Sequence, residues 1–253
     1  MIWALALILA SCQVDTEGPA DELARRLHTD ERQRFGFLYR AEGTSVLDCV
    51  LPNRQFHVTV DASSGSIELR HGSITGSPLA VSLPDALLVH RSAFEGSSIP
   101  TEWVAVPGEP GTPAPKVVSA ALGVDAASYV LSRGLPEDGA GIVASLIDSA
   151  SNVSHLDVPA GEVPGLDGYR IELPADAGPA ALSGTGDVVA EVWVDRNDAV
   201  RRVRVFERGS DSGGWTLDFT EAARSLDISP DGITQIDEVA SLRPAPIAAC
   251  RMG

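Results

Sequence analysis

The chain has 253 residues, 44% of them hydrophobic, and 35 acidic side chains against 19 basic ones give it a formal charge of −16 at pH 7. This length and apolar content are enough for one globular domain with a substantial core. So negative a charge repels phosphate backbones and anionic head groups, which argues against a nucleic-acid partner. Any membrane attachment must then come from a covalent lipid.

The N-terminus is typical of an exported lipoprotein. Residues 1–10 are almost wholly apolar but too few to span a membrane, and they suit the apolar part of a signal peptide. The run Leu9-Ala10-Ser11-Cys12 matches the small-residue pattern that lipoprotein signal peptidase cuts. We therefore predict a signal peptide over residues 1–11 and a lipid on Cys12. The alternative is a buried N-terminal segment that ends in a core cysteine, but residues 13–20 are polar and rich in helix breakers, as a tether should be.

Residues 12–33 are predicted to form this tether and a polar helix over residues 20–32, ahead of a single domain over residues 34–253. In the first part of that domain, apolar residues recur at every second position, which is the period of half-buried strands. Residues 61–65 supply turn chemistry and predict a hairpin. The expected strands cover residues 34–41, 56–60, 67–69, 79–83, 86–94 and 102–106.

A Pro-rich loop over residues 107–115 separates these strands from two Ala-rich segments. Residues 116–133 and 136–149 place apolar side chains at helical spacing, with Val118 and Leu122 on one stripe of the first segment. Two helices are therefore expected to interrupt an otherwise β chain.

The strand pattern returns at residues 169–173 and is strongest over residues 187–208, which predict a long antiparallel hairpin turning at residues 196–198. On its second strand Val203 and Val205 share one face, while the alternate arginines point the other way, so one face is expected to be dry and the other wet. A last strand over residues 215–219 precedes an irregular tail.

The cysteines support export independently. Once the lipidated Cys12 is set aside, Cys49 and Cys250 remain as a pair, and two thiols in an oxidising compartment are expected to bond. The alternative is a pair of unbonded, buried thiols.

The late hairpin resembles that of the exported actinobacterial lipoproteins of the LppX and LprG group, which are related in fold to the LolA and LolB lipoprotein carriers. The resemblance rests on Glu191-Val192-Trp193-Val194-Asp195, a short polar turn, and Val200-Arg201-Arg202-Val203-Arg204-Val205. The lipobox cysteine, the early strands, the paired helices and the run over residues 226–230 match by position. The Asn197-Asp198 turn and the cysteine pair depart from the group.

This resemblance implies an α+β fold in which a strongly curved antiparallel β-sheet, a half-barrel, carries helices on its concave face. It also implies an apolar cavity between sheet and helices that accepts acyl chains. From the residues alone a solid core is the alternative, because side chains that line a hollow and side chains that fill a core are equally hydrophobic. The small residues of the mid-chain helices favour a hollow. The expected lining residues are Phe35, Phe37, Tyr39, Leu122, Val203 and Val205.

The sequence carries none of the common catalytic motifs: no Gly-x-Ser-x-Gly elbow, no His-Glu-x-x-His helix, no Walker loop and no Cys-x-x-Cys. Its five histidines are scattered rather than spaced as metal ligands. We therefore expect a protein without enzymatic activity, metal or cofactor.

These features together predict a monomeric lipoprotein, anchored on the extracytoplasmic face of the cell membrane in a bacterial envelope. It would bind or carry the acyl chains of a lipid or glycolipid without catalysis. The alternative is a lipoprotein with a filled core that binds a protein or an envelope polymer.

Overall fold

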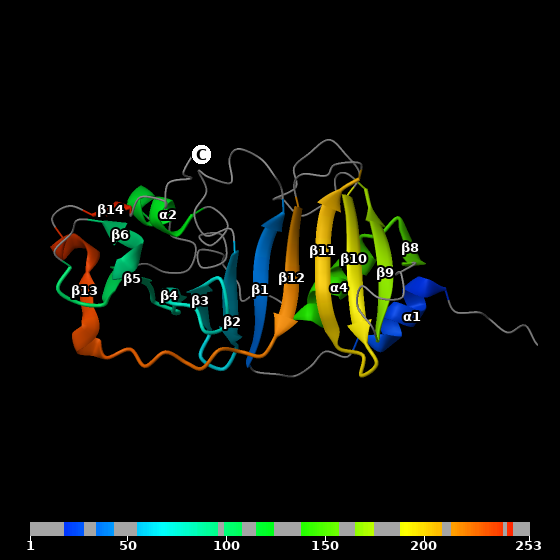
Figure 1. The fold of residues 1–253 in the computed structure, drawn as a ribbon, viewed down its shortest axis with the longest axis horizontal. Helices are drawn as coiled ribbons and strands as arrows, with labels where there is room; N and C mark the ends of the chain where they lie inside the picture. Colours follow the sequence, from blue (N-terminus) through cyan, green and yellow to red (C-terminus); the bar gives the residue numbers. More distant parts are fainter. Residues whose placement is uncertain are drawn as a thin grey trace, which may run out of the picture.

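The computed structural model of the chain describes residues 18–27, 34–42, 55–95, 99–107, 115–123, 138–156, 165–174, 188–208, 214–239 and 242–244. Over these residues the fold is α+β: one large, mostly antiparallel sheet of twelve strands with three α-helices (Figure 1). The predicted α+β class is thus confirmed. Cys12, Cys49 and Cys250 lie outside the described residues, so the lipid attachment and the disulfide stay predictions.

The strand order in the large sheet is β13-β7-β5-β4-β3-β2-β1-β12-β11-β10-β9-β8. Only β13 and β7 pair in parallel among these neighbours. At the centre β1 pairs with β12, so the first and last long strands of the domain lie side by side and join the two halves of the sheet. The strands are β1 Arg34–Glu42, β2 Gln55–Asp61, β3 Ser66–His71, β4 Pro78–Ser82, β5 Ala86–His90, β7 Trp103–Pro107, β8 Asn152–His155, β9 Leu166–Leu173, β10 Val188–Asp195, β11 Val200–Glu207, β12 Gly214–Thr220 and β13 Ile233–Gln235.

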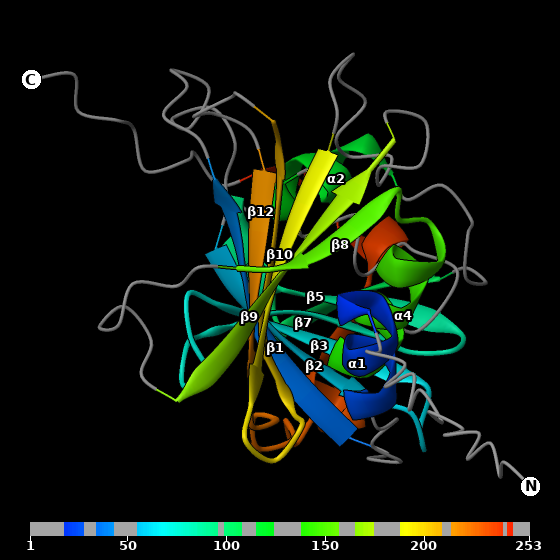
Figure 2. The same ribbon diagram turned by 90° about the vertical axis from the view of Figure 1, so that its right-hand side faces the viewer.

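The three helices lie on one side of this sheet, here called the helix face (Figure 2). They are α1 Pro19–Arg26, α2 Lys116–Leu122 and α4 Gly139–Asp148. The strand directions rotate along the sheet in the same view, as expected for a twisted sheet. Pro19 starts α1, where its missing N–H costs nothing, and the Asp138 carboxylate caps α4 by accepting a hydrogen bond from the Gly141 N–H at 2.8 Å.

Alternation along the strands sends one set of apolar side chains to the helix face and the other set to the opposite side, here called the back face. Val58 and Val60 of β2 are fully buried on the helix face, whereas His57 and Thr59, which alternate with them along the strand, lie on the back face. Each strand of the central sheet therefore contributes to two chemically different surfaces.

A strap, residues 221–229, crosses half of the back face after β12 and leads to β13. Ala223 is tied to the sheet because its N–H donates to the Thr59 hydroxyl at 3.0 Å and its carbonyl accepts from Arg34 at 2.7 Å. The strap passes close to β1 at Gly36, where a Cβ would lie 2.6 Å from the Glu221 carbonyl oxygen. It covers an apolar cluster formed by Val81, Leu88, Trp103 and Ala105, which Leu83, Leu226, Ile228 and Ile233 complete.

The elements differ from the sequence expectations mainly in the tail and around the helices. The strand β8 and the parallel strand β13 were not predicted, and both are short. The small sheet of β6 Phe94–Glu95 and β14 Arg243–Pro244 was also missed. Helix α2 ends at Leu122, because Gly123 adopts a positive φ of 82° that a helix does not continue through; the rest of the predicted helix lies outside the described residues.

Candidate functional site

The helix face carries two apolar clusters that share a common border. One cluster gathers residues of β1 to β7 with α2, and the other gathers residues of β9 to β11 with α1 and α4. Three half-buried side chains, Ile142, Trp215 and Phe219, pack against both clusters and are here called the seam. The apolar surface of the sheet is therefore continuous from α2 to α4.

The six residues expected to line a cavity all lie on this helix face, but they divide between the clusters. Phe37, Tyr39 and Leu122 belong to the cluster under α2, with Phe35 half-buried at its border. Val203 and Val205 belong to the cluster under α4. The rings of Phe37 and Phe219 lie 5.8 Å apart, and this contact bridges β1 to the seam. All except Phe35 are buried in packed surroundings; that they line a cavity remains a prediction.

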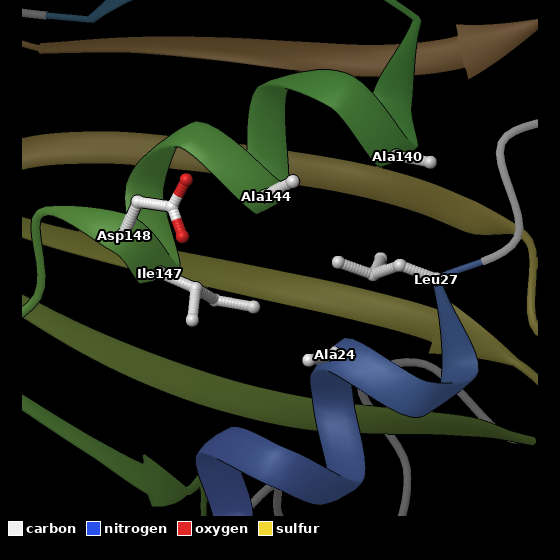
Figure 3. Close-up of a pocket in the computed structure, with 6 residues that line it drawn as sticks. All are labelled: Ala24, Leu27, Ala140, Ala144, Ile147 and Asp148. Carbon is white, nitrogen blue, oxygen red and sulfur yellow. The ribbon is translucent and has the colours of Figure 1, made fainter.

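A groove of about 150 Å³ lies between α1 and α4, with a different set of residues around it (Figure 3). Leu27 and Ile147 point toward each other across the gap, and the carboxylate of Asp148 stands at one end. The gap exists because α1 and α4 present small side chains where they pass each other. The lining consists of Ala24, Leu27, Ala140, Ala144, Ile147 and Asp148.

The sequence contains a signal for this groove in the spacing of small residues along α4. Ala140, Ala144 and Asp148 recur at a spacing of four residues, which places them on one face of a helix. Ala144 is exposed although the residues beneath it, Val143 and Leu146, are buried in the cluster under α4. The groove is thus an outward-facing depression above a packed layer.

One arginine fixes α1 beside the groove. The guanidinium of Arg26 donates to the carboxylates of Asp198 at 2.6 Å and Asp167 at 2.7 Å. It also donates to the Tyr169 hydroxyl and to the Asp195 carbonyl oxygen, each at 3.0 Å. Burial alone would lower the pKa of Arg26, but these hydrogen bonds raise it above its ordinary value, so the group stays charged. We call Arg26 and these four partners the α1 clamp.

A second set of contacts extends the clamp along α1. The Tyr169 hydroxyl donates to the Glu22 carboxylate at 2.8 Å, and the other oxygen of Glu22 lies 3.3 Å from the His155 imidazole. Burial raises the pKa of Tyr169, so its hydroxyl stays protonated and able to donate. Leu23, on the same helix, is fully buried in the cluster below. Helix α1 is held by apolar packing on one side and by charged hydrogen bonds at its C-terminal end.

No family model matches the sequence, and no curated protein matches it. Solved structures resemble the fold at low sequence identity. The lipoprotein LppX of Mycobacterium tuberculosis aligns with a TM-score of 0.45 and 14% identity, over 82% of this chain and 98% of LppX. An uncharacterised conserved protein of Thermus thermophilus aligns at 0.36 and 8% identity, covering 86% of this chain and 99% of that one. A LolA superfamily protein of Nitrosomonas europaea aligns at 0.30 and 8% identity, over 83% and 96% respectively. These values establish neither a family nor a function.

The described residues around the groove are mostly aliphatic. The groove offers aliphatic side chains and one carboxylate, and the described residues contain no group of three or more potential metal ligands. Among the same residues, no helix has the length and apolarity that crossing a bilayer would demand. Its aliphatic lining makes the groove the candidate site for an apolar ligand.

Proposed function

We propose that the protein is a lipid-anchored extracytoplasmic lipoprotein that binds the acyl chain of a lipid or glycolipid and catalyses no reaction. The observation that carries the proposal is the apolar groove between α1 and α4, which opens to solvent above a continuous apolar layer. The lipobox at Cys12 and the resemblance of the late hairpin to the LppX and LprG group support the envelope location.

The size of the groove limits what it can hold as it stands. A volume of about 150 Å³ is smaller than the 300–1,000 Å³ of typical ligand pockets and close to that of a cavity that holds benzene. Only the end of a single chain fits. Each methylene moved out of water contributes about 0.8 kcal/mol, so extraction of a whole lipid requires a longer enclosed path.

We place that longer path under α1, because α1 is a short element held by a few identifiable contacts. If α1 moved away from α4, Leu23 of α1 would leave the apolar cluster. The side chains packed in that cluster, including Tyr169 and Ile171 of β9, would then be uncovered. The acyl chain would then lie against the helix face and approach the seam. In this proposal the sheet is curved around the chain, and Phe35, Phe37, Tyr39, Leu122, Val203 and Val205 form the wall that the chain reaches.

Native mass spectrometry of the protein purified from the bacterial envelope tests the proposal. We expect a bound lipid that is released on denaturation. Ala144→Phe fills the groove from an exposed position and should lower the lipid-bound fraction several-fold. Ala120→Phe is the matched control, since Ala120 is an exposed alanine of α2 outside the groove, and it should leave the bound fraction unchanged.

Two results would contradict the proposal. Wild-type protein that carries no lipid, and takes none up from vesicles, would favour the alternative of a filled-core module that binds a protein or an envelope polymer. Equal lipid loss in the Ala144→Phe and Ala120→Phe variants would place the lipid away from the groove.

A further inference from the structure

The back face of the sheet divides into a covered half and an open half. The strap lies over the strands on the β7 side, whereas no described helix or strand crosses the back face over β9 to β12 (Figure 1). The open half, together with the neighbouring strand β1, carries arginine on every second strand. Arg40 of β1, Arg204 of β11 and Arg170 of β9 lie in one row, with Thr216 and Glu191 between them. Two strand spacings, about 10 Å, separate these arginines.

The charged groups of this half lie at two depths. Four arginines, Arg40, Arg202, Arg204 and Arg208, have side chains that are 39–48% exposed. Their partners are recessed: the side chains of Asp218, Glu191 and Glu172 are 13–29% exposed. An approaching partner therefore meets guanidinium groups first, and the carboxylates lie beneath them.

The recessed groups also hold the arginines in place. Asp218 accepts from both Arg40 and Arg202, which fixes two guanidinium groups on one carboxylate. The guanidinium of Arg202 lies 5.9 Å from the centre of the Trp193 ring, and that of Arg204 lies 4.7 Å from the centre of the Phe206 ring. Arginines ordered in this way lose little side-chain entropy on binding an anion, and their planar donors suit phosphate oxygens.

We infer that this open half of the back face docks on the head groups of anionic phospholipids. The guanidinium groups spread both along and across the strands, so they match anions distributed over a plane better than anions arranged along one line. Arginine above aromatic rings is also suited to the boundary between phosphate and acyl chain. The inference is independent of acyl-chain binding, because the face lies on the side of the sheet opposite to the groove.

The net charge of −16 does not prevent such docking at close range. Charges further away than a Debye length, about 8 Å at physiological ionic strength, are largely screened. The side chains of the docking face therefore determine whether it attracts anionic head groups. The net charge of the whole molecule predicts only that binding is weak without an anchor. A lipid on Cys12 would raise the effective concentration at the membrane and make a weak face sufficient.

Vesicle co-sedimentation tests the inference on the chain from residue 12 with Cys12→Ser, which keeps all described residues and carries no lipid anchor. We expect binding to vesicles containing phosphatidylglycerol, little binding to pure phosphatidylcholine vesicles, and loss of binding at high salt. The double variant Arg202→Gln/Arg204→Gln should weaken binding about thirtyfold. The control Arg91→Gln/Arg224→Gln changes the net charge equally at two exposed positions outside the open half and should bind as the parent does.

Several outcomes overturn the inference. The first is that the protein does not bind phosphatidylglycerol vesicles. The second is that the two double variants weaken binding equally. The third is that the protein binds soluble polyphosphate but not vesicles. Co-purifying lipid is a separate measurement, so either proposal can fail while the other stands.

Discussion

At the scale of single residues, Arg26 is a partly buried arginine whose guanidinium makes several hydrogen bonds, two of them to carboxylates. Its side chain is 14% exposed and spans from α1 to the β10–β11 turn, where Asp198 has a positive φ of 61°. The sequence does not predict this contact, because Arg26 and Asp198 are 172 positions apart and neither belongs to a recognisable motif. Only the pairing of β9, β10 and β11 brings the two together.

Replacing Arg26 with glutamine should therefore loosen α1. We expect Arg26→Gln to lower the free energy of unfolding by about 1–3 kcal/mol, since it removes charged hydrogen bonds, of which the one to Asp167 is largely exposed and contributes little. Denaturant unfolding gives the stability, and amide hydrogen exchange should show faster exchange in α1. Arg25→Gln, at an exposed position of the same helix, is the control. Unchanged exchange in α1 would show that apolar packing alone holds the helix.

His57 gives a second prediction at this scale, because it lies buried beneath the strap. Burial lowers the pKa of His57, and the nearby charge of Arg70 adds to this effect. The unfolded chain binds a proton at this residue near pH 6.5, whereas the folded chain resists it, so stability is complete above pH 6.5 and is lost as the pH falls below that value. Burial lowers the pKa of His71 and His90 as well, and they act in the same direction.

Denaturant unfolding between pH 7.5 and pH 5.5 measures this effect. The free energy of unfolding should fall by up to about 1.4 kcal/mol per pH unit for each such histidine. His57→Gln should reduce the slope even though it lowers stability at pH 7.5. Identical slopes for the wild type and His57→Gln would exclude His57 as a source of the pH dependence.

At the scale of elements, the sequence predicts what local periodicity determines. The strands β1, β2, β3, β9, β11 and β12 fall where the alternation of apolar and polar residues places them, and β10 falls within the hairpin predicted over residues 187–208. Strand β8 escapes prediction since only Val153 of its four residues is apolar, and β13 because three residues carry no period. Which strands become neighbours, and hence where the groove forms, depends on long-range pairing that no local pattern encodes.

The strap offers a test at this scale, because its close passage over β1 depends on the absence of a side chain at Gly36. A Cβ there would lie 2.6 Å from the Glu221 carbonyl oxygen and 3.0 Å from the Cα of Ala222. We expect Gly36→Ala to lower the free energy of unfolding by about 1–3 kcal/mol through overpacking. Gly232→Ala is the matched control, as a Cβ there meets nothing within 4 Å. Equal effects of the two substitutions would show that the strap moves aside freely.

At the scale of the whole molecule, the amino-acid composition predicts less about binding surfaces than does the placement of charged and apolar residues on each face of the sheet. The chain has a net charge of −16, yet one face of its sheet exposes guanidinium groups more than the carboxylates that they pair with. In the same way, the hydrophobic content predicts a core, but it cannot tell a fully packed core from one with a groove beside α1. Both properties depend on which face of a strand or helix each residue occupies, and they become visible only when the strands are paired.

The predicted bridge between Cys49 and Cys250 acts at this same scale. In the sequence, Cys49 falls between β1 and β2, and Cys250 follows β14 near the end of the chain. Their bond would close a loop of about 200 residues and contribute at most roughly 5 kcal/mol by restricting the unfolded chain. We expect neither thiol to react with an alkylating reagent until a reductant is added, as mass spectrometry would show. Removing both thiols, in Cys49→Ser/Cys250→Ser, should lower the melting temperature, whereas Cys12→Ser should not. Alkylation of both cysteines in the native, unreduced protein would show that the two ends of the fold are held by packing and hydrogen bonds alone.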